Sequence, residues 1–258
     1  MLQQHAPQTA DGRHPYPGDV VDASLEVVST TEPSAQTPAR VRIVSGGGRY
    51  TDPWHPFAET SAAIASAATE LGLTAEVVDP EPEALSDLTD VDLMVINSGG
   101  NPEVELTPDP TWSAAFDAFG EWITAGHPLL GVHTASNAFP DWPQWPALLG
   151  GRWVRGRSRH PARTEFTFDA LPGSLHHPAL GGLTSVTAFD ERYSYLEVHP
   201  EATGLLQHRF EDIDHVIGWA RTDGLTKVVF DGLGHGPESY ESAERVHLLS
   251  SELRWLLA

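Results

Sequence analysis

The segment Gly131-Val-His133-Thr-Ala-Ser136 places a histidine where an apolar run gives way to small and polar residues. Residues 128–132 predict a short strand, and the small residues after it predict a tight turn. In many α/β enzymes, a sharp turn after a strand displays a catalytic side chain at the edge of the sheet. We therefore predict that His133 is displayed at a candidate active site, where an imidazole can act as an acid, a base or a ligand.

The chain contains no cysteine, and Lys227 is its only lysine. A thiolate nucleophile, a disulfide and a cysteine-type zinc site are therefore excluded. Because Lys227 lies in the strand-like segment 227–230, we do not expect Schiff-base chemistry. Catalysis in this chain must rest on imidazoles, carboxylates and hydroxyls.

Thirteen histidines occur, and many of them lie in predicted turns. We predict His133, His177, Asp190, Glu191 and His235 as catalytic residues, because imidazoles and carboxylates together share general acid–base work or bind a divalent metal such as zinc. None of the local spacings is a helical HxxxH or HExxH, so a metal site would need convergence in the tertiary structure. The sequence leaves open whether any cofactor is bound. Adjacent carboxylates such as Asp190 and Glu191 point to opposite faces of a strand, so they do not flank a bond as glycosidase carboxylates do.

A second group of polar and aromatic residues suits a sugar ligand, which needs hydrogen bonds and a ring face to stack on. The predicted binding residues are His55, Asn97, Ser136, His160, Tyr193 and Trp219. Trp54 and Trp153 are alternatives to Trp219 for stacking. For any one of these side chains a structural role is the more common outcome.

The first half of the chain alternates strand-like and helix-like patterns. Strands are predicted at residues 41–44, 74–78, 92–96 and 128–132, and helices at 56–71 and from Asp109 onward. This alternation predicts a parallel sheet covered on both faces, with ligands bound beyond the carboxyl ends of its strands. Three of those ends carry small and polar residues, at 45–48, 97–100 and 133–137. The glycine-rich turn at 45–48 matches no phosphate-binding motif.

The second half predicts shorter strands and a closing helix at 241–257. The strands at residues 164–168, 184–188, 205–208, 215–219 and 227–230 suggest an antiparallel extension of the sheet, or a layer beside the site. Residues 1–39 are rich in proline and small polar residues and predict a flexible N-terminal arm of unassigned role. We expect one α/β domain over residues 40–258.

The formal net charge of −21 repels nucleic acid and anionic membranes. No apolar stretch is long enough to span a membrane, and the N-terminus lacks the pattern of a secretory signal. We therefore expect a cytoplasmic protein whose partner is a small carbohydrate. Homo-oligomerisation is left open.

Six short motifs occur in the order found in the ThuA-like (trehalose utilisation) family, over about residues 40–257. They are Gly131–Ser136, Gly151-Arg-Trp-Val154 leading to His160, His177-Pro178 with Gly182-Leu183, Asp190-Glu191-x-Tyr193, Trp219, and Leu233-Gly-His235. The resemblance implies a class I glutamine amidotransferase-like fold, which is a flavodoxin-like three-layer α/β sandwich with a mostly parallel central sheet. It also implies a role in the use of trehalose, a related disaccharide or a keto-sugar.

Glutamine amidotransferases carry a nucleophilic cysteine in a Gly-x-Cys turn, and Gly131-Val-His133 puts an imidazole at that place. Because the chain has no cysteine, the resemblance implies the fold without amidotransferase activity. We expect a sugar-processing hydrolase, isomerase or lyase that uses histidine and carboxylate acid–base chemistry. The alternative is a non-catalytic sugar-binding or assembly module on the same fold.

Overall fold

A computed structural model describes residues 37–101 and 106–258. The predicted N-terminal arm lies almost entirely outside these residues, so it stays a prediction. In the part of the chain that is described, no helix is both long and apolar enough to cross a membrane.

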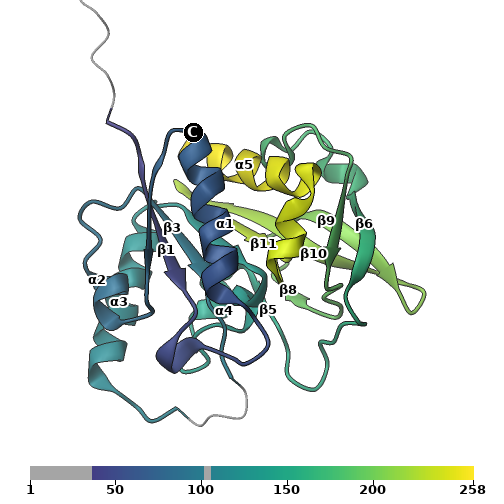
Figure 1. Cartoon of the computed structure of the whole chain (residues 1–258). Coiled ribbons are helices and arrows are strands. Elements are labelled where there is room, and N and C mark those ends of the chain that lie inside the picture. Colours follow the sequence, from purple (N-terminus) through teal and green to yellow (C-terminus); the bar gives the residue numbers. More distant parts are fainter. Residues whose placement is uncertain (1–36, 102–105) are drawn as a thin grey trace, which may run out of the picture. The chain divides into compact units, whose positions relative to one another are not determined.

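A nine-stranded sheet runs through the middle of the domain in the order β2-β1-β3-β4-β11-β10-β9-β6-β7 (Figure 1). Its strands are β1 (Arg40–Ser45), β2 (Thr74–Val78), β3 (Leu93–Asn97), β4 (Leu129–Val132), β6 (Thr164–Ala170), β7 (Ser185–Asp190), β9 (Thr203–Phe210), β10 (Ile213–Asp223) and β11 (Thr226–Asp231). The short strands β5 (Gly151–Arg152) and β8 (Glu197–Val198) pair separately as a two-stranded antiparallel sheet.

The helices connect and cover these strands. The α-helices are α1 (Phe57–Glu70), α2 (Pro82–Ser86), α3 (Pro110–Thr124), α4 (Trp145–Leu149) and α5 (Ala243–Leu257). Single-turn 3-10 helices are η1 (Gly48–Tyr50), η2 (His133–Asn137), η3 (Pro172–Ser174), η4 (Pro178–Leu180) and η5 (Pro237–Glu241).

The parallel core of the sheet is larger than its first four strands. Strands β2, β1, β3 and β4 are parallel as predicted, and β11 then pairs in parallel with β4 and antiparallel with β10. The sequence grouped residues 227–230 with the antiparallel strands, which holds for the pairing with β10 but not for the pairing with β4. The local sequence pattern cannot distinguish a parallel from an antiparallel partner. The parallel partner of β11 is β4, which lies almost a hundred residues earlier in the chain. The antiparallel extension consists of β10, β9, β6 and β7.

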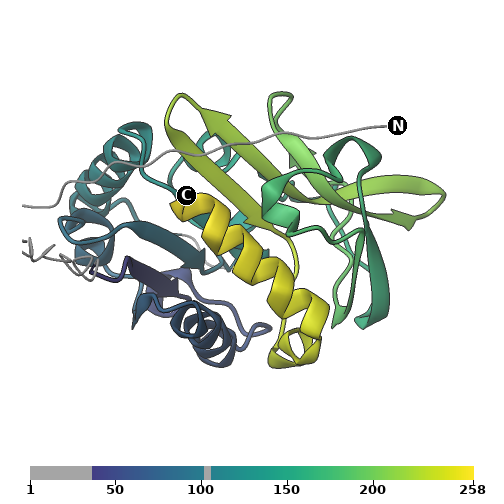
Figure 2. The ribbon, with the colours of Figure 1, turned by 90° about the horizontal axis from the view of Figure 1, so that it is seen from above.

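Two apolar layers pack on opposite faces of the sheet. Helices α1 and α5 lie side by side on one face, and α2 and α3 lie on the other (Figures 1 and 2). Neighbouring residues of one strand serve different layers: Val95 packs with the α1 and α5 side, and Ile96 packs with the α2 and α3 side. This two-sided burial explains why the parallel strands are continuously apolar.

The ends of the long helices follow the sequence signals. The side chain of Asp109 accepts a hydrogen bond from the backbone N–H of Thr111 at the start of α3, and Pro110 occupies the first turn. Gly72 follows α1 with a φ of +79°, a conformation that glycine adopts at little cost. The sequence did not predict the five-residue helices α2 and α4, because they are too short to show a helical period.

Gly151 gives a test of the packing between the second sheet and the core. A Cβ atom at this position would lie 2.6 Å from the backbone oxygen of Glu197 and 2.5 Å from the ring of Trp219. We expect Gly151→Ala to lower the free energy of unfolding by about 1–3 kcal/mol, as overpacking does, measured by urea denaturation. Gly173→Ala is the control, since nothing lies within 4 Å of its added Cβ. Equal stabilities of the two variants would contradict this close packing.

Candidate functional site

His133 sits at the turn that the sequence singled out. It follows β4, begins η2 and has a φ of +47°, in the left-handed region that non-glycine residues rarely adopt. This conformation costs about 1–2 kcal/mol. The turn is closely packed. A Cβ atom added at Gly131 would lie only 3.1 Å from the Cβ of Ala135, so the strand end and the turn leave no room for a larger residue here. The backbone thus turns sharply and directs a buried imidazole beyond the end of the strand.

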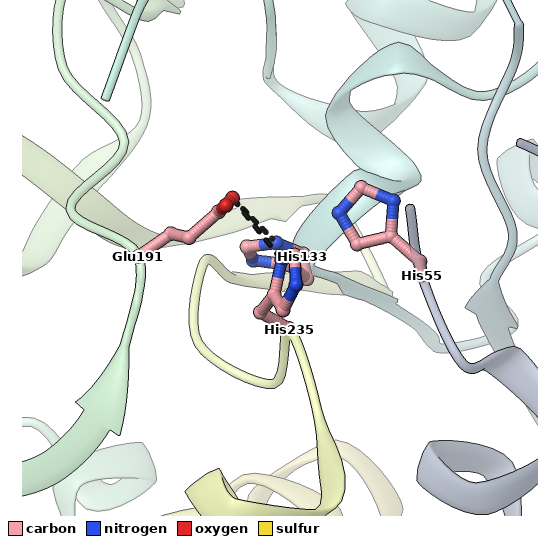
Figure 3. Close-up of side chains that lie close together, drawn as sticks. All are labelled: His55, His133, Glu191 and His235. Carbon is pink, nitrogen blue, oxygen red and sulfur yellow. Dashed lines mark ion pairs between the residues drawn. The ribbon is translucent and has the colours of Figure 1, made fainter. Parts of the chain in front are cut away.

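Three imidazoles and one carboxylate converge at this edge of the sheet (Figure 3). His55, His133, Glu191 and His235 each offer one ligand atom, and these atoms all lie within 4.8 Å of one another. The three histidines follow β1, β4 and β11, which are parallel strands, so their carboxyl ends meet at one edge. Glu191 comes from the antiparallel extension, directly after β7.

Hydrogen bonds behind the imidazoles fix their orientation. Nδ1 of His55 lies 2.7 Å from a carboxylate oxygen of Asp52, and Nδ1 of His133 lies 2.8 Å from the carbonyl oxygen of Gly232. Because both partners can only accept, each Nδ1 carries a hydrogen and donates it, and each Nε2 faces the centre of the cluster. These two Nε2 atoms and Nδ1 of His235 are buried and lack a hydrogen-bond partner in the described structure. Unpartnered buried ring nitrogens that are oriented by a carboxylate or a carbonyl are typical of metal-binding histidines.

The charges around the cluster favour a cation at its centre. One oxygen of Glu191 lies 3.5 Å from Nε2 of His133 and 3.2 Å from Nδ1 of His235. Burial opposes ionisation of Glu191, but these two imidazoles lower its pKa below the ordinary value. Burial also lowers the pKa of His133, yet the Glu191 and Asp190 carboxylates raise it overall. At His55 burial prevails over Asp52 and lowers the pKa of the imidazole.

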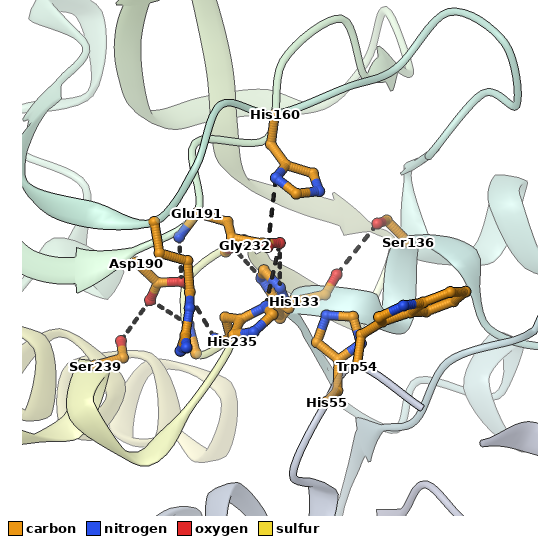
Figure 4. A network of polar contacts seen from close by, with 12 residues as sticks. Trp54, His55, His133, Ser136, His160, Asp190, Glu191, Gly232, His235 and Ser239 are labelled. Atoms are coloured by element: carbon orange, nitrogen blue, oxygen red, sulfur yellow. Dashed lines mark hydrogen bonds and ion pairs between the residues drawn. The ribbon is translucent and has the colours of Figure 1, made fainter. Parts of the chain in front are cut away.

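Asp190 supports the cluster from below rather than facing the pocket (Figure 4). It is fully buried, and its carboxylate accepts hydrogen bonds from the backbone N–H groups of Glu191, Gly234 and His235 and from the hydroxyl of Ser239. With four donors bound, its oxygens have no free direction toward a ligand. Asp190 and Glu191 point different ways, as the strand geometry predicted.

A pocket of about 710 Å³ opens above the cluster. Its lining residues are Asp52, Pro53, Trp54, His55, Gly100, Thr134, Asn137, Trp153, His160, Glu191, Tyr193 and His235. The ring of Tyr193 stacks on His133 with a centroid distance of 4.2 Å, and Trp54 is 54% exposed at the rim. The lining combines aromatic faces with imidazoles and carboxylates, and among the residues that the structure describes it includes neither arginine nor lysine.

Most of the predicted site residues gather at this pocket. His133, Glu191 and His235 meet in the cluster, together with His55, which the sequence had assigned to ligand binding. His160 and Tyr193 line the pocket, and Nδ1 of His160 lies 3.4 Å from the second oxygen of Glu191.

Four predicted residues lie elsewhere, and the structure corrects their placement. His177 caps η4 and contacts the ring of Trp255 on α5, outside the cluster. Asn97 donates hydrogen bonds to Thr60 and Ser61 within the core. Ser136 bonds the carbonyl oxygen of His133 inside η2, and Trp219 is fully buried against Phe230. Each satisfies a local packing or hydrogen-bonding need, so none of the four is among the residues that line the pocket.

Asp52, which orients His55, was not among the site residues predicted from the sequence. The signal was an aspartate three residues before a histidine, in the turn after the first strand. That spacing is common in turns, where aspartate bonds nearby backbone N–H groups, as Asp52 also does with Trp54 and His55. Only the burial of the Asp52–His55 pair, which the sequence does not show, indicates that Asp52 orients the imidazole.

Asp190 provides a test of how the cluster is supported. We expect Asp190→Asn to destabilise the fold by about 1–3 kcal/mol, because an amide group would place a donor against bound N–H groups. Urea denaturation measures the change, and Asp169→Asn on the exposed part of β6 is the matched control. Unchanged stability of Asp190→Asn would show that these hydrogen bonds do not hold the loop.

Comparisons with known proteins agree on the fold. The model of the family described as ThuA, trehalose utilisation, matches residues 40–256. A ThuA-like protein from Parabacteroides merdae superposes with a TM-score of 0.69 at 16% identity, covering 86% of this chain and 91% of the other. A ThuA-like protein from Bacteroides uniformis gives 0.60 at 18% identity, covering 88% and 94%.

A glutamine amidotransferase from Thermotoga maritima gives a TM-score of 0.55 at 15% identity, covering 86% of this chain and 99% of the other. At such identities the likeness shows the fold, and it confirms the predicted amidotransferase-like α/β architecture. Among curated proteins no match to the chain was found.

Proposed function

The chain belongs to the ThuA family of trehalose utilisation, and on this premise we propose that it is a metal-dependent enzyme that processes a saccharide. One observation carries the proposal: three buried imidazole nitrogens without hydrogen-bond partners converge with Glu191 within 4.8 Å. A buried polar atom without a partner is costly, and three that face one point indicate a shared ligand.

The donor set fits a divalent transition metal. Imidazole nitrogens with one carboxylate suit zinc and similar ions, whereas magnesium and calcium prefer oxygen ligands. His55, His133, His235 and Glu191 would hold the ion, and Asp52 and the carbonyl oxygen of Gly232 would orient two of the imidazoles. When bound, such an ion polarises a substrate oxygen or lowers the pKa of a water molecule.

The pocket above the cluster suits a sugar. Its volume lies in the usual range for small-molecule sites, and Trp54, Trp153 and Tyr193 offer faces on which a sugar ring can pack. The absence of arginine and lysine from the lining favours an uncharged substrate. Trehalose, a related disaccharide or a keto derivative of either meets these requirements.

For the reaction we favour proton abstraction beside a carbonyl group, leading to isomerisation or elimination. This chemistry needs an electrophilic centre and a nearby base. A metal ion held by the cluster would supply the first, and His160, which is partly exposed beside Glu191, is an imidazole within reach of a ligand. Hydrolysis by a pair of carboxylates is not favoured, because Asp190 is bound by four donors below the pocket.

The metal proposal predicts one divalent ion per chain in purified protein, measured by elemental analysis. We expect His55→Ala, His133→Ala and His235→Ala each to lose most of this metal while retaining the fold by circular dichroism. His176→Ala, which removes an exposed imidazole, is the control. Asp52→Asn should weaken binding by about 10–100-fold, as loss of an orienting partner does. Wild-type protein that remains metal-free after incubation with zinc, cobalt, manganese and nickel would contradict the proposal.

The substrate proposal is tested with trehalose, related disaccharides and their 3-keto forms, with and without added divalent metal. Products are followed by mass spectrometry, which separates hydrolysis from isomerisation and elimination by the mass change and by retention. We expect turnover of at least one keto form, and its loss in His133→Ala and after chelation. Sugar binding without any turnover would instead favour the non-catalytic binding module.

A further inference from the structure

The loop of residues 232–235 supplies two elements of the histidine cluster. Its first residue, Gly232, provides the carbonyl oxygen that orients His133, and its last residue is His235. The loop has little room to move, because a Cβ on Gly232 would lie 2.2 Å from the backbone oxygen of Ile217. A displacement of this loop would therefore turn two of the three imidazoles.

Two buried carboxyl groups, those of Asp190 and Asp231, accept hydrogen bonds from backbone N–H groups of the loop. Asp190 accepts the backbone N–H groups of Gly234 and His235 at 2.7 and 3.2 Å. Asp231, at the end of β11, accepts the backbone N–H of Leu233 at 3.0 Å. The loop is therefore held by hydrogen bonds to two carboxyl groups that the fold has removed from water.

Arg245 of α5 is the cation that faces Asp231. Its guanidinium lies 2.7 Å from the Asp231 carboxylate, and both side chains are fully buried. The ring of Tyr240 covers the guanidinium at 4.9 Å. A third carboxyl, Glu252, is also buried beside the pair, and burial and the nearby Asp231 carboxylate raise its pKa well above the ordinary value. Burial also raises the pKa of Asp231, and the Arg245 guanidinium that contacts this carboxyl opposes the rise.

Removing only one member of a buried ion pair leaves the other charge buried without compensation, which is strongly destabilising. Stranding Asp231 would affect more than stability, because its other oxygen binds the loop through Leu233. Arg245 also contacts the loop itself, since its guanidinium donates to the carbonyl oxygen of Leu233 at 3.5 Å. Arg245 is therefore linked to the loop 232–235 in two ways, directly through Leu233 and indirectly through Asp231.

We propose that Arg245 is a positioning residue of the histidine cluster, which acts through Asp231 and the loop 232–235 on the orientation of His133 and His235. It lies outside the pocket lining and touches no substrate. The expected effect of Arg245 on metal affinity rests on the proposed function, whereas its expected effect on the orientation of the His133 imidazole does not.

The test compares Arg245→Met, which removes the cation, with the double variant Arg245→Met/Asp231→Asn, which removes both charges. Arg254→Met, on the exposed side of the same helix, is the matched control. If Arg245→Met does not fold, Arg245→Lys takes its place, since it keeps the charge but not the planar fork of donors.

The first readout uses metal-free protein and reports the tautomer of His133 by long-range ¹H–¹⁵N correlation spectra, with the signal assigned by its loss in His133→Ala. We expect wild type and Arg254→Met to show the Nδ1–H form and Arg245→Met to lose that uniform signature. The double variant should recover part of it, because the side-chain amide introduced at position 231 retains an oxygen for the N–H of Leu233 and leaves no stranded charge.

The second readout is the affinity and visible absorption spectrum of bound cobalt(II). We expect Arg245→Met to bind about 10–100-fold more weakly than wild type, in line with the loss of an orienting contact. A folded Arg245 variant with the wild-type His133 tautomer and the wild-type cobalt affinity would overturn the proposal, leaving a role in stability alone. If wild type binds no cobalt, the proposed function fails, while the tautomer comparison still decides the role of Arg245.

Discussion

The site depends on the fixed orientation of buried imidazoles. Asp52 and the carbonyl oxygen of Gly232 each accept a hydrogen bond from one ring nitrogen and thereby turn the opposite nitrogen toward the centre of the cluster. Without such a partner, the ring of a buried histidine would not be held in one orientation. The hydrogen bonds behind the rings therefore matter as much as the ring atoms that face the centre.

The sheet explains why these partners are available in one place. Five parallel strands bring the ends of β1, β4 and β11 to a common edge, and the antiparallel extension carries Glu191 to the same edge from the other half of the chain. His133 occupies the sharp turn after β4 in a left-handed conformation that the packing around Gly131 maintains. A glutamine amidotransferase shares this fold, so a chain without cysteine shows how an unchanged framework can carry a different set of reactive groups.

Three acidic side chains, Glu191, Asp190 and Asp231, are buried in or near the histidine cluster. Glu191 lies among the imidazoles, Asp190 binds the loop and the neighbouring turn, and Asp231 pairs with Arg245 on α5. Each of these carboxyl groups is contacted by hydrogen-bond donors, by imidazoles or by a cation, which offsets part of the cost of burying it. The acidic surface implied by the net charge of −21 is a separate feature, and it requires no contribution from these groups.

The sequence by itself determined the alternation of strands and helices, the turn that displays His133 and the exclusion of thiol chemistry. These properties depend on neighbouring residues or on composition, so they can be read locally. It also placed His235, Glu191, His160 and Tyr193 near the site, although partly through the resemblance to a family. Only the tertiary structure decided that His55 joins the cluster and His177 does not, and that Asp190 supports a loop rather than facing the pocket. The physical reason is strand order: a parallel sheet joins strand ends that are far apart in the chain, and no local pattern states which ends become neighbours.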